Sequence, residues 1–267
     1  MKNELFSIGP FTIYGYGLMM ALGILTAYYM VEYRAKKKGM ESEKIFPLAI
    51  WAVVSGLLGA KILYLITRLP ELMEDPSLIV YCLKDGFVVY GSIIGGILGA
   101  YIYCRKSKLA FWKIFDLVVP ALALAQCIGR IGCLLAGCCY GMEVSADNPI
   151  AIVFHDSSYA PNNIPLLPTQ IISSILDFAH FGILMLLSKK LKTDGQLAGC
   201  YLIFYGIGRF ILEFFRGDLI RGNVGTLTTS QFISIFICLA GVIIFFMLPR
   251  LSKNQETSEQ KETESQS

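Results

Sequence analysis

Charged residues are scarce in this chain. Asp, Glu, Lys and Arg make up 16% of its 267 residues, whereas 55% are hydrophobic. Soluble domains carry about 25% charged residues, so the composition excludes an ordinary soluble domain and indicates that lipid is the solvent. The net charge of +3 is no sign of nucleic-acid binding in such a chain. We therefore expect a lipid bilayer, and no nucleic acid, as the partner of the chain.

The sequence also lacks the charge order of a secretory signal peptide. Such a peptide carries positive charge before its apolar core and small residues after it. Here the first apolar run, residues 11–31, is followed by a basic cluster at residues 34–38. This order predicts a retained transmembrane helix whose N-terminus lies outside and whose basic end lies in the cytoplasm.

Long apolar runs recur along the chain, and a helix needs about 20 residues to cross a bilayer. The runs cover residues 11–31, 45–66, 87–103, 114–128, 169–187, 197–215 and 232–248. Lys and Arg cluster after the first, third, fifth and seventh runs, which places these clusters on one side of the membrane. The predicted fold is an all-α integral membrane protein with seven transmembrane helices, the N-terminus outside and the C-terminus cytoplasmic.

These runs form a single predicted membrane domain, residues 1–253. Its longest polar interruption, about residues 142–168, is predicted to be an outer loop or a small cap. The polar tail, residues 254–267, is predicted to be disordered because it has almost nothing apolar to bury. No internal repeat is visible, which argues against a transporter whose interrupted helices bind a small anion.

One stretch at the end of the fourth run concentrates unusual residues. Residues 129–141 hold one arginine, four glycines and three cysteines. An arginine at membrane depth is costly unless it is paired or meets an anion, so Arg130 indicates a functional site. The glycines are expected to free the backbone from helical geometry and to let a ligand approach closely.

Among the charges in other apolar runs we single out Lys61, Arg209 and Glu213. Arg209 and Glu213 are four residues apart, so they share a helix face and can form an ion pair. In one interpretation this pair only neutralises charge and locks two helices together. In the other, Arg130, Arg209 and Lys61 surround one anionic group, for which a phospholipid headgroup is the natural choice in a membrane pocket.

The cysteines Cys133, Cys138 and Cys139 allow three interpretations: soft-metal ligation, thiol redox chemistry, or inert packing of small side chains. Their spacing matches no standard structural zinc motif and no second Cys/His pair stands nearby, so we expect no metal and no cofactor. Arg130 could lower the pKa of a neighbouring thiol. A disulfide between vicinal cysteines would be strained, so Cys133 or Cys82 is the better partner for Cys138 or Cys139.

Five segments carry a family likeness. They are residues 6–10, residues 16–19, residues 129–132 with Gly137 and Gly141, residues 168–170, and residues 209–216. Together they resemble the prolipoprotein diacylglyceryl transferases of bacterial membranes. The similarity runs from about Phe6 into the seventh apolar run, and seven crossings with the N-terminus outside is the topology of that family.

The resemblance implies a multi-pass protein of the bacterial cytoplasmic membrane. The family transfers the diacylglyceryl group of phosphatidylglycerol to the lipobox cysteine thiol of a preprolipoprotein and releases glycerol phosphate. Arg130 would then grip the phosphate, and Arg209 would stabilise charge developing on the leaving group. Tyr16 would help to line the lipid cavity and Glu213 would orient Arg209. Substrate-binding roles are also expected for Lys61 and Gly141.

Some positions differ from the family pattern. Tyr90 stands where the family carries a histidine that is a candidate base, and Cys133 and Cys138 stand where it carries polar side chains. Tyr90 is therefore a candidate catalytic base, although a tyrosine with a pKa of about 10 needs Arg130 or Lys61 nearby to lower that pKa. A thiolate at Cys133 or Cys138 is the alternative, either as the base or as a lipid acceptor.

Two further functions stay open beside the lipoprotein transferase. One is a divergent paralogue that modifies another acceptor, and the other is a membrane thiol-redox protein that uses Cys133, Cys138 and Cys139. The redox function predicts that the cysteines change state with reductant and that Arg209→Ala is harmless. The transferase function predicts that Arg130→Ala or Arg209→Ala abolishes activity.

Overall fold

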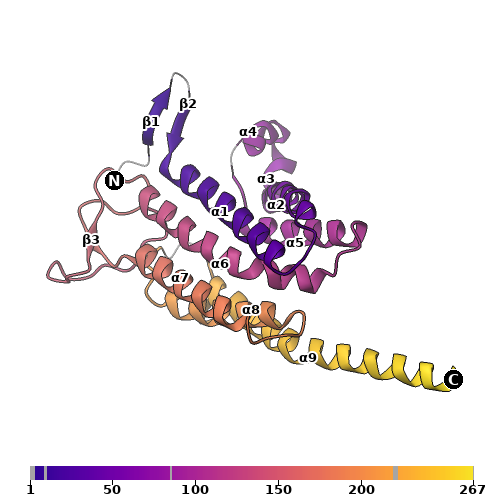
Figure 1. The fold of residues 1–267 in the computed structure, drawn as a ribbon. Helices are drawn as coiled ribbons and strands as arrows, with labels where there is room; N and C mark the ends of the chain where they lie inside the picture. The colour runs from indigo at the N-terminus through magenta and orange to yellow at the C-terminus, as the bar shows by residue number, and fades with distance from the viewer. Residues whose placement is uncertain (1–3, 9–10, 85, 219–221, 267) are drawn as a thin grey trace. The chain divides into compact units, whose positions relative to one another are not determined.

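The computed structural model describes residues 4–8, 11–84, 86–218 and 222–266 (Figure 1). Gly9 and Pro10, which belong to one family-like segment, lie outside the described residues. The chain divides into two compact units, one made of residues 1–30 and 115–267 and the other of residues 31–114. Each unit is described by itself.

Long helices cover the apolar runs. They are α1 (Gly15–Lys37), α2 (Ile45–Thr67), α5 (Val89–Lys106), α6 (Phe111–Ala136), α7 (Thr169–Leu187), α8 (Gln196–Glu213) and α9 (Thr229–Gln266). The short helices α3 (Leu69–Glu74) and α4 (Ile79–Lys84) and the 3-10 turns η1 (Ser42–Lys44) and η2 (Pro76–Leu78) lie between them.

Four helices in the described part of the chain are long and apolar enough to cross a membrane. They span Ser42–Thr67, Phe111–Ala136, Thr169–Leu187 and Thr229–Pro249. Many large apolar side chains are more than half exposed, among them Leu57, Ile94, Ile175 and Phe246. Soluble proteins rarely expose so much apolar surface, whereas lipid tails cover it without penalty. The chain is thus a mostly helical membrane protein, and the seven crossings and their orientation stay predictions.

Among the described residues, three short antiparallel hairpins depart from the expected all-α fold. They pair β1 (Glu4–Ile8) with β2 (Phe11–Tyr14), β3 (Ile152–Val153) with β4 (Pro165–Leu166), and β5 (Asn223–Val224) with β6 (Leu227–Thr228). The first apolar run therefore begins as a strand and becomes helical only at Gly15. Aromatic and β-branched residues fill residues 11–14, and such residues favour strands.

Helix α6 corrects the expectation that the fourth apolar run ends at residue 128. The helix continues to Ala136, so Gly129, Arg130 and Gly132 lie inside it. In lipid the backbone must satisfy its own hydrogen bonds, which keeps a glycine-containing segment helical. Gly137 follows the last helical residue with a φ of +73°, which suits glycine, and the Cys138 amide donates to the Cys133 carbonyl over 3.1 Å.

Within the unit of residues 31–114, α2 packs against α5 through small residues. A Cβ added to Gly91 would collide with the carbonyl of Gly59, and one added to Gly95 would collide with that of Ser55. The sequence in α5 thus provides a small-residue face that allows two helix backbones to approach closely.

The other unit contains α7, α8, α9 and α6 from Phe115 onward; α8 packs against α7 and against α9, whose C-terminal half extends beyond the other helices in Figure 1. Its apolar core includes Val119, Leu184 and Tyr201. At the start of α8, two backbone amides are satisfied from α6: the Asp116 carboxylate accepts from Gly195 over 2.8 Å and from Ala198 over 2.7 Å. This cap fixes α8 to α6.

The two polar segments of the sequence differ in structure. Residues 142–168 form a small folded cap whose own core holds Phe154, Ala160 and Leu166. The cap lies where α6 ends and α7 begins. Helix α9 extends to Gln266, and the structure describes its side chains as far as Pro249. The disorder expected for residues 254–267 stays a prediction, as does the outer location of the cap.

Candidate functional site

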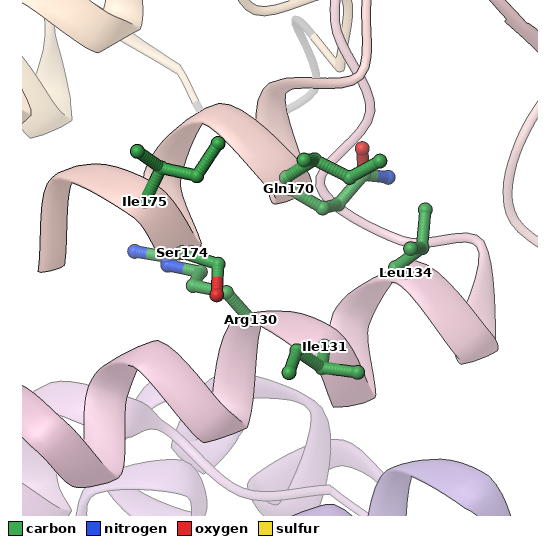
Figure 2. A pocket seen from close by; sticks show the side chains of 7 residues that line it. Arg130, Ile131, Leu134, Gln170, Ser174 and Ile175 are labelled. Atoms are coloured by element: carbon green, nitrogen blue, oxygen red, sulfur yellow. The ribbon is translucent and has the colours of Figure 1, made fainter. Parts of the chain in front are cut away.

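Arg130 projects from α6 toward α7 and lines a cavity of about 200 Å³ (Figure 2). The other lining residues are Ile131, Leu134, Gln170, Ile171, Ser174 and Ile175. The lining thus combines one cation, Arg130, with the polar side chains of Gln170 and Ser174 and four aliphatic side chains. Such a lining suits a ligand with an anionic headgroup and an apolar tail. Pockets for drug-sized ligands measure about 300–1,000 Å³, so this cavity holds a headgroup rather than a whole lipid.

Asp177 of α7 is the partner of Arg130 that sequence reasoning missed. The Arg130 Nε and Asp177 Oδ2 atoms lie 3.7 Å apart, longer than the 2.7–2.9 Å of a charge-assisted hydrogen bond. A guanidinium carries five N–H donors, so one long ion pair leaves Arg130 able to bind an anion. A carboxylate inside the fifth apolar run was the signal, because such residues mark functional sites in membranes.

The predicted ion pair between Arg209 and Glu213 is confirmed, with Arg209 Nη2 and Glu213 Oε2 2.7 Å apart. Their side chains are only 12% and 6% exposed. Two hydroxyls near the start of α9 hold the pair: Arg209 donates to Ser230 Oγ over 3.0 Å, and Thr228 Oγ1 donates to Glu213 Oε1 over 3.2 Å. The sequence offered no signal for these two partners, which come from β6 and from the first turn of α9.

Arg216 is a third buried arginine at this site. It forms a bidentate pair with Asp218, Nε to Oδ1 over 2.7 Å and Nη2 to Oδ2 over 2.5 Å. Its Nε also lies 3.9 Å from Glu213 Oε2. Arg216 is part of a family-like segment, but we did not predict it as a site residue. Its spacing of three from Glu213 was the available signal.

The loop after α6 and the loop after α8 pair with each other. The Met142 amide donates to the Phe215 carbonyl over 2.9 Å, and the Gly217 amide donates to the Tyr140 carbonyl over 3.1 Å. Between them, Gly141 forms an isolated bridge with Arg216. A Cβ at Gly141 would collide with the Leu167 carbonyl, so the structure uses this glycine for close backbone packing.

This pairing joins the two sequence segments that we expected to form one site. Arg209 has both Arg130 and Arg216 among its electrostatic neighbours. Repulsion among three guanidiniums in a buried region is relieved by carboxylates or by a bound anion. The carboxylates of Asp177, Glu213 and Asp218 provide the first. Arg209 and Arg216 each have a carboxylate oxygen within 2.7 Å, whereas the ion pair of Arg130 with Asp177 measures 3.7 Å.

The Sγ atoms of Cys133, Cys138 and Cys139 all lie within 4.8 Å of one another. Across the described residues, the eight cysteines form no disulfide. Cys133 is thus the near neighbour that we expected, whereas Cys82 belongs to the other unit. Hydrogen bonds with Cys133 and Cys138, followed by the charge of Arg216, hold the pKa of the Cys139 thiol below its usual range.

Tyr16 in the first turn of α1 lies beside this cluster. A Cβ built on Gly132 of α6 would come within 3.4 Å of the Tyr16 ring, so the two helices touch at this point. Tyr16 is 41% exposed and interacts electrostatically with the three cysteines and with Arg130. Its expected role in lining a lipid cavity stays a prediction.

Lys61 and Tyr90 belong to the other unit. Lys61 Nζ donates to the Cys82 carbonyl over 3.0 Å and to the Gly86 carbonyl over 2.9 Å, and it lies 4.2 Å from the Phe87 ring centroid. These contacts tie α2 to the segment between α4 and α5. Tyr90 lies in the first turn of α5 and is 40% exposed. The binding role of Lys61 and the catalytic role of Tyr90 stay predictions.

Comparison with known proteins covers almost the whole chain. A family model described as prolipoprotein diacylglyceryl transferase matches residues 3–247. A phosphatidylglycerol–prolipoprotein diacylglyceryl transferase of Clostridium tetani is 48% identical over 92% of this chain and 97% of its own length. The transferase numbered 2 of Clostridium perfringens is 48% identical over 97% of this chain and 100% of its own.

A more distant relative supports the same assignment. The phosphatidylglycerol–prolipoprotein diacylglyceryl transferase of Halalkalibacterium halodurans is 30% identical over 90% of this chain and 83% of its own length. The resemblance seen in the five sequence segments is therefore confirmed. The chain belongs to the prolipoprotein diacylglyceryl transferase family.

Proposed function

We propose that this chain is a phosphatidylglycerol–prolipoprotein diacylglyceryl transferase, a membrane enzyme of lipoprotein biosynthesis. It moves the diacylglyceryl group of phosphatidylglycerol to the lipobox cysteine thiol of a prolipoprotein, forming a thioether and releasing glycerol phosphate. The observation that carries this proposal is that the backbones of the two family-like loops pair beside the ion-paired arginines Arg209 and Arg216, while Arg130 lines a headgroup-sized cavity.

Arg130 is the phosphate-binding residue in this proposal. Its guanidinium presents a planar fork that matches two phosphate oxygens, and the low dielectric of a buried site strengthens the contact. The headgroup occupies the cavity while the acyl chains lie along the exposed apolar side of α7, where Ile171 is 38% and Ile175 is 64% exposed. A bound phosphate then replaces the long contact of Arg130 with Asp177.

Arg209 is the proposed stabiliser of the leaving group. The acceptor sulfur attacks the glyceryl carbon, the carbon–oxygen bond breaks, and negative charge grows on the departing phosphate oxygen. A donor that is already oriented stabilises this charge without reorganisation. Glu213 and Ser230 hold the Arg209 guanidinium at 2.7 and 3.0 Å, which supplies that orientation.

The membrane setting is part of the proposal. The chain crosses the bacterial plasma membrane seven times, with the N-terminus outside and the C-terminus in the cytoplasm. Support comes from the basic clusters, including Arg34, Lys36 and Lys37 in the last turn of α1 and Arg105 and Lys106 in that of α5. Reporter fusions after residues 38, 108, 192 and 253 should all score as cytoplasmic, and an external signal at any of them would require a different topology.

A direct assay tests the function. Purified protein receives phosphatidylglycerol and a lipobox peptide, and mass spectrometry measures the diacylglyceryl adduct on the peptide. Arg130→Ala and Arg209→Ala should each lower the rate by about 10²–10³-fold, the loss typical of a donor to developing negative charge. Arg68→Ala is the matched control, because this exposed arginine belongs to the other unit, where it pairs with neighbouring Glu71 and lies over the Tyr64 ring. Full activity in both site variants would overturn the proposal.

The three clustered thiols also support a second candidate function, membrane thiol-redox chemistry. A membrane thiol-redox protein would need Sγ atoms this close together, and three of them lie within 4.8 Å. That function predicts that oxidation reversibly removes two free thiols from the protein. It also predicts that Arg209→Ala leaves this thiol oxidation unchanged. A divergent paralogue would transfer the lipid group to other thiol acceptors but not to a lipobox peptide.

A further inference from the structure

The cluster of Cys133, Cys138 and Cys139 has a geometry that its sequence spacing does not suggest. Zinc holds thiolate sulfurs at about 2.3 Å, which separates any two sulfur ligands of a tetrahedral ion by about 3.8 Å. The three Sγ atoms already lie within 4.8 Å of one another. Closing on one zinc ion would shorten the sulfur–sulfur separations by at most about 1 Å.

The backbone around these sulfurs is fixed by α7. Gln170 Nε2 donates to the Cys138 carbonyl over 2.9 Å, and Thr169 Oγ1 donates to the Cys139 carbonyl over 2.8 Å. Cys139 itself has a φ of +60°, a left-handed conformation that residues other than glycine rarely adopt. Such a conformation persists only where the surroundings impose it, and it is frequent at functional sites.

The number and exposure of the thiols suit a metal site with one open position. Catalytic zinc sites use three protein ligands and leave the fourth for water or substrate. All three cysteines are half-buried, so none of them is sealed inside the helical core. Three thiolates and Zn²⁺ carry one net negative charge, and Arg216, which donates a hydrogen bond to Cys139, offsets it. A disulfide joins two cysteines, so redox chemistry would use only two of these three thiols, whereas a metal ion can bind all three.

The proposed reaction needs a way to ionise the acceptor thiol. A cysteine with a pKa of about 8.5 is only about 3% thiolate at pH 7. The two histidines of the chain are engaged elsewhere. His155 lies in the cap, where its Nδ1 is 2.7 Å from Asn163 Oδ1, and His180 stacks on Tyr201 with ring centroids 5.2 Å apart. His180 also lies ten residues along α7 from Gln170, about 15 Å away.

We propose that Cys133, Cys138 and Cys139 bind a zinc ion whose fourth position receives the thiol of the acceptor cysteine. This inference rests on the proposed transferase function. On coordination the acceptor loses its proton, because metal-bound thiols are deprotonated. The bound sulfur then forms the carbon–sulfur bond as the glyceryl carbon–oxygen bond breaks. The electron pair of that bond leaves with glycerol phosphate, and the thiol proton passes to water or to this product. The zinc ion keeps its oxidation state throughout. A metal at this site would replace our expectation, from the cysteine spacing, of a site without metal.

Metal analysis tests the site independently of activity. The full-length protein in detergent, kept reduced and loaded with Zn²⁺, should retain about one zinc per chain after gel filtration. Cys133→Ser and Cys139→Ser should each remove most of it, whereas Cys238→Ser, a half-buried thiol of α9, should retain it. Cys133→His should restore zinc binding, because histidine ligates zinc but forms no disulfide. Zinc retention by both serine variants, or none by the loaded wild type, would overturn the site.

A second measurement tests the open position. The Co²⁺-loaded protein should change its visible spectrum when a lipobox peptide is added, and a peptide with serine in place of the cysteine should cause no change. Removal of zinc should leave a transferase whose rate rises with pH up to about 8.5, where the free thiol ionises. A spectrum insensitive to the cysteine peptide would exclude substrate coordination.

The two proposals fail in different ways. A wild-type protein that transfers lipid to the peptide at full rate without zinc refutes the metal inference and leaves the transferase function intact. A protein that binds zinc at the three cysteines but transfers lipid to no lipobox peptide refutes the transferase function and the catalytic role of the metal. Loss of two free thiols on mild oxidation, with no zinc bound after reduction and loading, supports redox chemistry and overturns the metal site.

Discussion

Replacing Glu213 by glutamine tests how the buried charges hold the site together. The substitution keeps the shape of the side chain and can preserve the contact with Thr228. It removes the negative charge that lies 2.7 Å from Arg209 and 3.9 Å from Arg216. Arg216 retains its bidentate pair with Asp218, so the main loss falls on Arg209.

The magnitude follows from charge and burial. At an effective dielectric of about 20, two unit charges at the distance of this pair attract each other by about 6 kcal/mol before desolvation is counted. Glutamine still accepts a hydrogen bond, which recovers about 1 kcal/mol. Removing one partner of a buried pair typically costs about 3–5 kcal/mol, and we expect Glu213→Gln to destabilise the protein by about 3 kcal/mol.

The assay combines stability with kinetics in detergent. Denaturation should show the loss of stability, and transfer to a lipobox peptide should show kcat reduced by at least tenfold with little change in the KM for phosphatidylglycerol. Glu71→Gln is the control, because it breaks an exposed pair with Arg68 and should change neither quantity measurably. The double variant Arg209→Gln/Glu213→Gln should be less destabilised than the sum of its single changes. Additive losses, or an unchanged kcat in Glu213→Gln, would refute the reasoning.

Three further predictions concern the scaffold of the site. Gly217→Ala should abolish transfer, because its Cβ would collide with the Gly141 carbonyl where the two loops pair, whereas Gly208→Ala should be tolerated because open space surrounds it. Asp116→Ala should lower the stability by about 2–3 kcal/mol in denaturation assays, since two buried amides of α8 lose a charged acceptor. Gln170→Leu should weaken zinc retention by about 10–100-fold in a chelator competition while the protein still folds, because it releases a carbonyl of the cysteine cluster.

Local features of the site could be predicted from the sequence. The spacing of four between Arg209 and Glu213 predicted their ion pair, and the apolar run starting at Thr169 matched α7 at both ends. Helix periodicity and run length carry this information within a single element. Asp177 could have been found by the same rule that singled out Arg130, because both are charges within apolar runs.

Contacts between distant segments could not be predicted in this way. The pairing of the loop at Gly141 with the loop at Gly217 depends on how α6 and α8 pack, which no local pattern encodes. The glycines near Arg130 were expected to break the helix, but the backbone in lipid has no partner other than itself and stays helical to Ala136. Lys61 donates to carbonyls of its own unit, and its expected role at the anion stays a prediction.

The most direct measurement follows both products of one reaction. Phosphatidylglycerol labelled in its headgroup glycerol is given to the purified protein with a lipobox peptide, and mass spectrometry locates the lipid while the released label is counted. We predict one labelled glycerol phosphate for each diacylglyceryl group, with the lipid on the peptide cysteine as a thioether. Release of label without any peptide adduct, or an adduct only on the enzyme's own cysteines, would contradict transfer to the lipobox thiol.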